Sequence, residues 1–491
     1  MVVSMPSISE GETTRQYRLS LASSAADDEE DHHYDGCFEG SEKKMEIDFI
    51  PMDGSDVELL PKDGGLRTYN RQFWSEIVAL LNGSILLHTP EDKFDAYLIS
   101  ESSLFVYNDR IIILTCGTTL LLKTLPAFIA AASKIGLEVS WFQYSRKNFL
   151  FPEKQHSPHK TFDMEVKFLE EIFPSGRPFV MGPMTSDHWY LFVADFIDRG
   201  DRTARGDSWC EAARGLGAVC DAKDGRKVMD KDQMLNVYMY GIDPHVAQLF
   251  VRGDSLILPS IFTDTNFGDT SSSGTSSGTA SPKFTSSPNS THCENSMKDH
   301  QTKKGDVDVN ALAFEGFDFC TTAEESTERS GIGGLLAGDG SVSHAHLFEP
   351  CGYSMNGEAN EGQAYWTIHI TPEASCSYAS FETNYNCTSY HALIERIIKV
   401  FRPAKFTTVE HVDQDSMMGT AGPLTAANVD GYQAAGRTLT EFGCKDYVVQ
   451  MCNYQSKTVK YLAPVPPVNL LGQHAAGLAN HPTFSTASAG R

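Results

Sequence analysis

Short apolar runs separated by turn residues are the feature that most limits how this chain can fold. The runs Ala96 to Ile99, Leu104 to Tyr107 and Ile111 to Thr115 each have the length of a strand, and Asn108-Asp109 is typical of a turn. Residues Tyr365 to Ile370 alternate bulky and polar side chains, as a strand does. Strand patterns outnumber helical ones without a βαβ alternation. The sequence therefore predicts an α+β layered fold of antiparallel sheets with helices packed outside.

Polar, low-complexity stretches indicate how the chain is organised. Residues 1–36 and 464–491 are expected to be a disordered N-terminal extension and a flexible C-terminal tail, because they hold too few apolar residues to offset the entropy of ordering. Residues 37–463 carry the apolar runs and are expected to form one domain. Low-complexity insertions are expected within it at about 198–231 and 263–343. No internal repeat is legible in the sequence.

Composition excludes several classes of function. The 491 residues include 40 Lys and Arg against 64 Asp and Glu, a net charge of -24, so no nucleic-acid partner is expected and cationic small molecules are favoured. No apolar run reaches the length needed to span a membrane, and no membrane partner is expected. The 11 cysteines form no CxxC pair, which favours reduced thiols in the cytoplasm. No metal site is expected, because HExxH and paired CxxC motifs are absent.

Three polar residues interrupt an apolar segment. Glu101, Ser102 and Ser103 lie in the middle of the stretch from Asp95 to Tyr107, which otherwise reads as one strongly apolar strand. Burying such side chains requires hydrogen-bond partners or a function. A strand bulge or bend that carries satisfied hydroxyl groups remains the simpler alternative.

Other reactive side chains lie near predicted strands. Cys116 follows a strand, where it is either a tuned thiol or a buried structural cysteine. Ser354, His369 and Glu373 lie within a short span, although a histidine in a strand is more often a core residue than a catalyst. Cys116 and His369 together could also form a thiol hydrolase, but no oxyanion-hole signature supports this reading.

Six blocks of sequence are far more specific than these short motifs. They are Tyr97–Val106, Thr115–Thr119, Tyr144–Phe149, Cys351–Gly357, Tyr365–Glu373 and Ser380–Asn384. In this order they closely resemble the eukaryotic S-adenosylmethionine decarboxylase proenzymes, from about Phe38 to about Tyr461. The fold implied by the resemblance is a four-layer αββα sandwich of two antiparallel sheets, which agrees with the strand pattern.

The resemblance implies a self-cleaving, pyruvoyl-dependent decarboxylase. Such an enzyme converts S-adenosyl-L-methionine to S-adenosylmethioninamine and CO2 for the synthesis of spermidine and spermine. It would cut its own chain between Glu101 and Ser102 into a β and an α chain. The Ser102 hydroxyl would attack the Glu101 carbonyl, and β-elimination from the ester would leave a pyruvoyl group derived from Ser102. The pyruvoyl carbonyl would form a Schiff base with the substrate amine and accept the electrons freed by loss of CO2.

The resemblance also implies the catalytic residues. Ser354 would act on the oxyoxazolidine intermediate of self-cleavage, and His369 would remove the α-proton of the ester. Cys116 would donate a proton to the substrate carbon after decarboxylation. Glu39 and Glu42 match two carboxylates that the family needs for activity.

Substrate contacts follow from the same comparison. Phe38 and Phe348 match the aromatic pair that sandwiches the adenine and faces the sulfonium cation. Glu373 matches the carboxylate that accepts both ribose hydroxyls. Main-chain groups of Ile99 and Glu101 would read the edge of the adenine.

A diamine site is implied only in part. Family members of the mammalian type bind putrescine in a buried acidic cluster, and Glu46, Asp232 and Glu382 occupy matching positions. Leu114, however, stands where a lysine is expected, and Asn236 where a further glutamate is expected. With one cation and one carboxylate lost, a putrescine molecule could still bind, but its activating role is in doubt.

A catalytically inactive paralogue that activates a partner decarboxylase is the alternative function. Such a regulator would be expected to lack at least one of Ser102, Cys116, Ser354 and His369, and all four are present. A homodimer and a heterodimer with a paralogue both stay open.

Overall fold

The structure is a computed structural model that describes residues 38–52, 64–100, 102–195, 233–253, 319–336, 341–442 and 447–459. The expected extension, the insertion at 198–231 and the tail lie outside the described residues. Glu101 and Asp232 of the expected sites lie outside them too.

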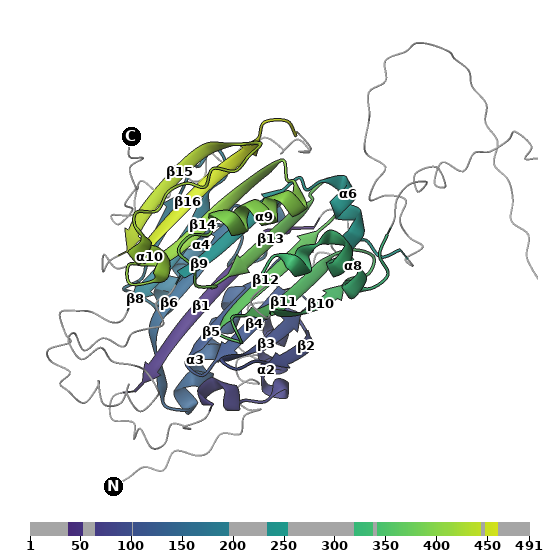
Figure 1. Cartoon of the computed structure of the whole chain (residues 1–491). Coiled ribbons are helices and arrows are strands. Elements are labelled where there is room, and N and C mark those ends of the chain that lie inside the picture. Colours follow the sequence, from purple (N-terminus) through teal and green to yellow (C-terminus); the bar gives the residue numbers. More distant parts are fainter. Residues whose placement is uncertain are drawn as a thin grey trace, which may run out of the picture.

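Two antiparallel sheets form the centre of the described chain (Figure 1). The first contains β1 (Lys43–Pro51), β2 (Ile85–Pro90), β3 (Phe94–Ile99), β4 (Ser102–Tyr107), β5 (Arg110–Thr115), β6 (Leu137–Lys147), β7 (Arg177–Met181) and β8 (Trp189–Asp195). The second contains β9 (Gln233–Tyr240), β10 (Val342–Leu347), β11 (Tyr353–Ala359), β12 (Ala364–Thr371), β13 (Tyr378–Thr383), β14 (Lys405–Asp413), β15 (Tyr432–Phe442) and β16 (Tyr447–Ser456).

The two sheets share one topology. The strand order is β2-β3-β4-β5-β1-β6-β8-β7 in the first sheet and β10-β11-β12-β13-β9-β14-β16-β15 in the second. The second order is the first with every strand number raised by eight. The described chain is therefore a structural repeat of two halves, which the sequence alone did not reveal because packing constrains the pattern of burial and not residue identity.

Helices cover the outer faces of both sheets. Over the first sheet lie α2 (Arg71–Val78), α3 (Leu125–Lys134) and α4 (Phe162–Ile172), and over the second α6 (Pro244–Ala247), α8 (Ala323–Ser330), α9 (His391–Phe401) and α10 (Met417–Ala421). Short 3-10 turns are η1 (Gly65–Thr68), η2 (Ala79–Leu81), η3 (Leu121–Thr124), η4 (Pro152–Lys154), η5 (Gln248–Phe250) and η6 (Ile332–Gly334). The predicted αββα sandwich is confirmed.

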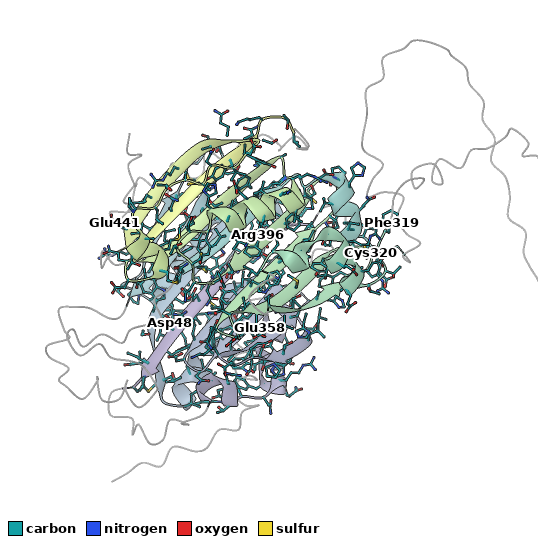
Figure 2. The ribbon with its side chains drawn as sticks, in the orientation of Figure 1. Asp48, Phe319, Cys320, Glu358, Arg396 and Glu441 are labelled. Atoms are coloured by element: carbon teal, nitrogen blue, oxygen red, sulfur yellow. The ribbon has the colours of Figure 1, made fainter. Side chains whose placement is uncertain are left out.

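Side-chain periodicity explains the layers. Helix α9 buries Leu393, Ile394 and Ile397 against the second sheet and points Arg396 outward, as the 3.6-residue period requires (Figure 2). Strand β12 confirms the predicted alternation: its Trp366 and Ile368 belong to the core shared with the helices. The intervening residues of β12 face the first sheet, and polar groups from both sheets meet there.

Two expectations need correction. The segment from Asp95 to Tyr107 is not one strand but the hairpin β3–β4, in which Ile99 pairs with Ser102. The insertion expected at 263–343 extends too far, because residues 319–336 contain α8 and η6. Apolar residues of this segment, Cys320 among them, belong to the core beneath the second sheet. No helix among the described residues is long and apolar enough to cross a membrane.

Candidate active site

Ser102 lies in a strained position at the start of β4. Only Ser100 and Glu101 separate it from Ile99, its partner in the β3–β4 register. Its φ angle is 151°, in a region that favours glycine and that L side chains rarely adopt. The residue is fully buried. A strained, buried serine at a strand start fits a functional position better than a plain strand residue, because such strain costs about 1–3 kcal/mol.

His369 on β12 reaches across the sandwich to Ser102. The Ser102 Oγ lies 2.9 Å from the His369 Nε2, and the Glu42 Oε1 lies 2.7 Å from the His369 Nδ1. A carboxylate only accepts hydrogen bonds, so we assign the imidazole proton to Nδ1 and leave Nε2 to accept from the serine hydroxyl. The three side chains form a buried chain from carboxylate to imidazole to hydroxyl, which can remove a proton at Ser102.

Glu42 is itself fixed by the second sheet. Its Oε1 accepts a hydrogen bond from the Ser380 hydroxyl at 2.5 Å, and its Oε2 accepts one from the Tyr378 hydroxyl at 3.5 Å. Both donors lie on β13, two residues apart and therefore on one face of the strand. This contact orients the carboxylate toward His369.

A second polar network surrounds Ser103. Its hydroxyl donates to the Asn356 Oδ1 at 2.5 Å and lies 3.1 Å from the Thr367 Oγ1 and 3.0 Å from the His369 Nε2. Sequence reasoning missed Asn356 and Thr367 as site residues. The signal that could have found them is strand alternation, which places Thr367 on the face of His369 and Asn356 on the face of Ser354.

Ser354 and Cys116 are placed beside this centre by strand register. Ser354 lies opposite His369 in the β11–β12 ladder and is buried. Ser102 pairs with Thr115, the last residue of β5, so the half-buried Cys116 follows at once. The Thr119 hydroxyl donates to the Cys116 carbonyl at 3.0 Å and fixes the turn.

Glu39 has a different setting from Glu42. The backbone amide of Phe151 donates to its Oε2 at 2.8 Å, and the amide of Ser41 donates to its Oε1 at 3.1 Å. Burial raises the pKa of Glu39, and these backbone bonds oppose the rise. The carboxyl group therefore ties the segment before β1 to the segment after β6.

Of the expected substrate contacts, Phe348 lies on a short turn, and Glu373, which follows β12, contacts the same turn. The Phe348 amide donates to the Gly352 carbonyl at 2.9 Å, and Cys351 within this turn is hydrogen-bonded to Glu373. Burial, with the nearby Glu373 charge, raises the pKa of the Cys351 thiol. Phe348 is half-buried and Glu373 is buried.

The remaining expected contacts lie on the first half of the chain. Phe38 is half-buried and stands four residues before Glu42, and Ile99 is fully buried at the end of β3. No hydrogen bond or ring contact joins Phe38 to Phe348 in the described structure.

The acidic cluster between the sheets contains a lysine that sequence reasoning missed. The Lys44 Nζ donates to the Glu382 Oε1 at 2.8 Å and lies 3.5 Å from the Glu46 Oε2. Asn236 also donates to Glu382. Lys44 pairs with Leu114 across β1 and β5, so the cation is displaced by one strand and not lost. The expectation of a missing positive charge was wrong. It considered position 114 alone, whereas the cation comes from Lys44 on the neighbouring strand.

Comparisons with known proteins identify the family to which the chain is similar. The sequence model of the family described as adenosylmethionine decarboxylase matches residues 35–455. The S-adenosylmethionine decarboxylase proenzyme of Dictyostelium discoideum is 31% identical over 86% of this chain and 86% of that protein. The Xenopus laevis protein of the same name is 32% identical over 84% of this chain and 93% of that protein.

A solved structure, the Trypanosoma brucei AdoMetDC-delta26 monomer, matches 72% of this chain and 99% of that chain, with a TM-score of 0.41 and 24% identity. The family match covers well over half of the sequence, and two relatives exceed 30% identity over most of its length. The chain therefore belongs to the adenosylmethionine decarboxylase family.

Proposed function

We propose that this chain is a self-cleaving decarboxylase of S-adenosyl-L-methionine, which forms S-adenosylmethioninamine and CO2 for spermidine and spermine synthesis. The observation that carries the proposal is the chain of contacts from Glu42 through His369 to the strained Ser102. A plain structural role would not need a buried base aimed at a serine in a disfavoured backbone conformation.

Self-cleavage uses the hydroxyl of Ser102 as the nucleophile. Its oxygen attacks the carbonyl carbon of Glu101, the C–N bond breaks, and an ester replaces the peptide bond. His369 then takes the α-proton of Ser102, and the Glu101 carboxylate leaves by β-elimination. Water hydrolyses the resulting dehydroalanine, which releases ammonia and leaves a pyruvoyl group. Ser354, opposite His369, is the polar group available to the tetrahedral intermediate.

The residues around Ser102 fit such a group. The position is fully buried, and Ser103 and His369 offer hydrogen-bond partners beside it. When formed, the pyruvoyl group supplies an electron sink for decarboxylation without an added cofactor. Cys116, one residue beyond the register partner of Ser102, holds the proton that the substrate carbon needs after CO2 has left.

Substrate binding uses the end of β12 that also carries His369. Phe348 offers an aromatic face to the adenine and the sulfonium, with Phe38 as the second face. Glu373 accepts the two ribose hydroxyls, and its contact with Cys351 fixes it beside the Phe348 turn. Main-chain groups at Ile99 and Glu101 would read the adenine edge.

The test combines a denaturing gel and intact-mass analysis of the chains with an assay of CO2 release from S-adenosylmethionine. We expect the wild-type chain to separate into residues 1–101 and 102–491, and Ser102→Ala to stay whole and inactive. A wild-type chain that stays whole overturns the proposal. A protein that is cleaved but releases CO2 only beside a partner decarboxylase would instead be the regulatory paralogue.

A further inference from the structure

Lys43 is a buried lysine whose ammonium group binds uncharged groups in the part of the chain that the structure describes. It lies on β1 with 0% of its surface exposed. Its Nζ donates to the Gly117 carbonyl at 2.8 Å and to the Gln155 Oε1 at 3.3 Å. Within the described residues no carboxylate forms an ion pair with it, and the oxygens of Glu39, whose charge acts on it from a distance, accept from backbone amides. Buried ammonium groups are costly, so this arrangement calls for a reason.

The two groups bound by Lys43 hold the turn that carries Cys116. The Gln155 amide also donates to the Gly117 carbonyl at 3.2 Å, and the Gly117 amide donates to the Glu39 carbonyl at 2.8 Å. Gly117 has a φ angle of 63°, which glycine adopts without strain. Both polar groups of the Gly117 backbone are thus fixed, and the position of the thiol is fixed with them.

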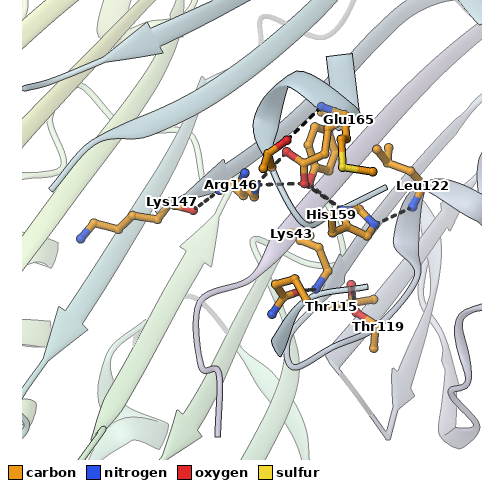
Figure 3. A network of polar contacts seen from close by, with 12 residues as sticks. Lys43, Thr115, Thr119, Leu122, Arg146, Lys147, His159 and Glu165 are labelled. Atoms are coloured by element: carbon orange, nitrogen blue, oxygen red, sulfur yellow. Dashed lines mark hydrogen bonds and ion pairs between the residues drawn. The ribbon is translucent and has the colours of Figure 1, made fainter. Parts of the chain in front are cut away.

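One group of charged side chains beside Lys43 does not neutralise its positive charge. Figure 3 shows Lys43 between the turn that carries Thr119 and a group formed by Arg146, Glu165 and His159. Arg146 pairs with Glu165 at 2.9 Å, and burial lowers the pKa of His159 to about 4, so that histidine is neutral. This group therefore adds no net negative charge.

Burial lowers the pKa of Lys43 to about 8, which keeps the ammonium form in the majority at neutral pH. The groups that act on it are Cys116, Glu39 and Glu165, whose charges raise this pKa, and Arg146, which lowers it. Of these three groups, Cys116 raises the pKa of Lys43 the most. Attraction between two groups is mutual, so the ammonium favours the thiolate of Cys116 in return.

We propose that Lys43 is a positioning residue for Cys116. Together with Gln155, Lys43 holds the turn that carries the thiol by binding the Gly117 carbonyl, and its ammonium group stabilises the thiolate that remains after proton donation. The proposal rests on the proposed function. In that step the S–H bond of Cys116 breaks, the proton bonds to the substrate carbon, and the S–H electron pair stays on sulfur. The ammonium balances the charge until the thiol regains a proton from solvent.

The first test measures thiol reactivity without any turnover. In the uncleaved Ser102→Ala protein, iodoacetamide alkylation of Cys116 at pH 7 is followed by peptide mass spectrometry. Lys43→Met should slow alkylation about tenfold, because the thiolate loses its neighbouring cation. Lys43→Gln, which keeps a donor for the Gly117 carbonyl but carries no charge, should slow it equally. Lys43→Arg should restore the rate.

Lys147 provides the matched control. It is equally buried, and burial also lowers its pKa to about 8, but it pairs with Asp187 at 2.8 Å and does not touch the Cys116 turn. Lys147→Met should therefore leave the alkylation rate of Cys116 unchanged. If it slows alkylation as much as Lys43→Met does, the effect is general disruption and the proposal is wrong.

The second test uses the cleaved enzyme. Lys43→Met should lower kcat at least about tenfold with KM within about twofold, because the thiol acts after the substrate has bound. Gln155→Leu should lower kcat less and leave alkylation nearly unchanged, since the charge remains. Wild-type alkylation in both neutral Lys43 variants would overturn the proposal. A wild-type enzyme that releases no CO2, with the alkylation pattern as expected, would overturn the proposed function alone.

Discussion

At the scale of single residues, the polar side chains between the sheets have separate tasks. Ser102, His369 and Glu42 are in direct contact and suit chemistry on the chain itself. Cys116 lies on the turn that follows Thr115, the register partner of Ser102, and is assigned to the protonation of the substrate carbon. Cleavage and turnover should therefore respond to different substitutions.

Cys116→Ala should leave self-cleavage largely intact and lower CO2 release on the order of 10²-fold, because a positioned proton donor contributes 10²-fold or more to rate. The two effects are read from a denaturing gel and from release of labelled CO2. A loss of cleavage as large as the loss of CO2 release would show that Cys116 acts in cleavage and not only in turnover. Unchanged CO2 release would show that it has no part in the mechanism.

Lys44 places an ammonium group in the acidic cluster in which the family resemblance predicts a diamine site. Its contacts with Glu382 and Glu46 leave those carboxylates already paired. Putrescine at millimolar concentration should therefore stimulate the wild-type enzyme weakly or not at all. CO2 release and cleavage rate with and without the diamine decide this. A large, saturable stimulation would contradict it.

The Lys44→Met variant should behave differently. It leaves Glu382 buried without its cation, so added putrescine should raise activity several-fold by supplying one. Lys44→Arg keeps the charge and is the matched control, which should stay insensitive. Equal responses from the two variants would show that the charge at Lys44 does not govern the site.

At the scale of elements, the sequence predicts strands better than it predicts their partners. The segments that became β3, β4 and β5 were legible as short apolar runs bounded by turn residues, and β12 was legible from its alternation of bulky and polar side chains. Their register was not, because it depends on contacts between distant segments: Ser103 binds Asn356, 253 residues away. The resemblance supplied the catalytic residues, but the Ser103 network and Lys44 required the fold.

Strand β14 contains a carboxyl group whose titration should be measurable. Burial raises the pKa of Glu410 from 4.5 to about 7, although the Gln450 side chain donates to it at 2.6 Å. The folded state thus holds this proton more tightly than the unfolded state. Its stabilising effect is present below pH 4.5 and is lost as pH rises through 7, by about 3 kcal/mol at most.

Glu410→Gln removes this proton-binding group. The difference in unfolding free energy between wild type and variant should therefore shift in favour of the variant between pH 5 and pH 8. Urea unfolding at the two pH values measures it. A difference that does not change with pH would show that Glu410 does not titrate in this range.

At the scale of the whole molecule, a polar segment should be dispensable. The residues from about Asn266 to about Thr302 lie outside the described structure and are rich in Ser, Thr and Gly. Deleting them should preserve solubility, cleavage and activity, because loop-closure entropy changes slowly with length. Assays of the deleted chain decide it, and loss of soluble protein would show that the segment packs against the core.

The two products of cleavage should stay together. Residues 1–101 contain β1, β2 and β3, and β1 lies between β5 and β6 in the middle of the first sheet. The fragment is therefore held by strand pairing on both sides of β1 as well as by β4 beside β3. Both chains should elute as one species in size-exclusion chromatography and separate only in denaturant. Separate elution under native conditions would contradict this.

Because β1 lies in the middle of the sheet, refolding should follow different kinetics before and after cleavage. An uncut chain folds in a unimolecular reaction, but a cut and denatured protein must bring two chains together, so its recovery should speed up with concentration. Uncut Ser102→Ala should recover at a rate that does not depend on concentration. After cleavage the native state is reached by a second-order route, and its persistence is set by how slowly β1 leaves the sheet.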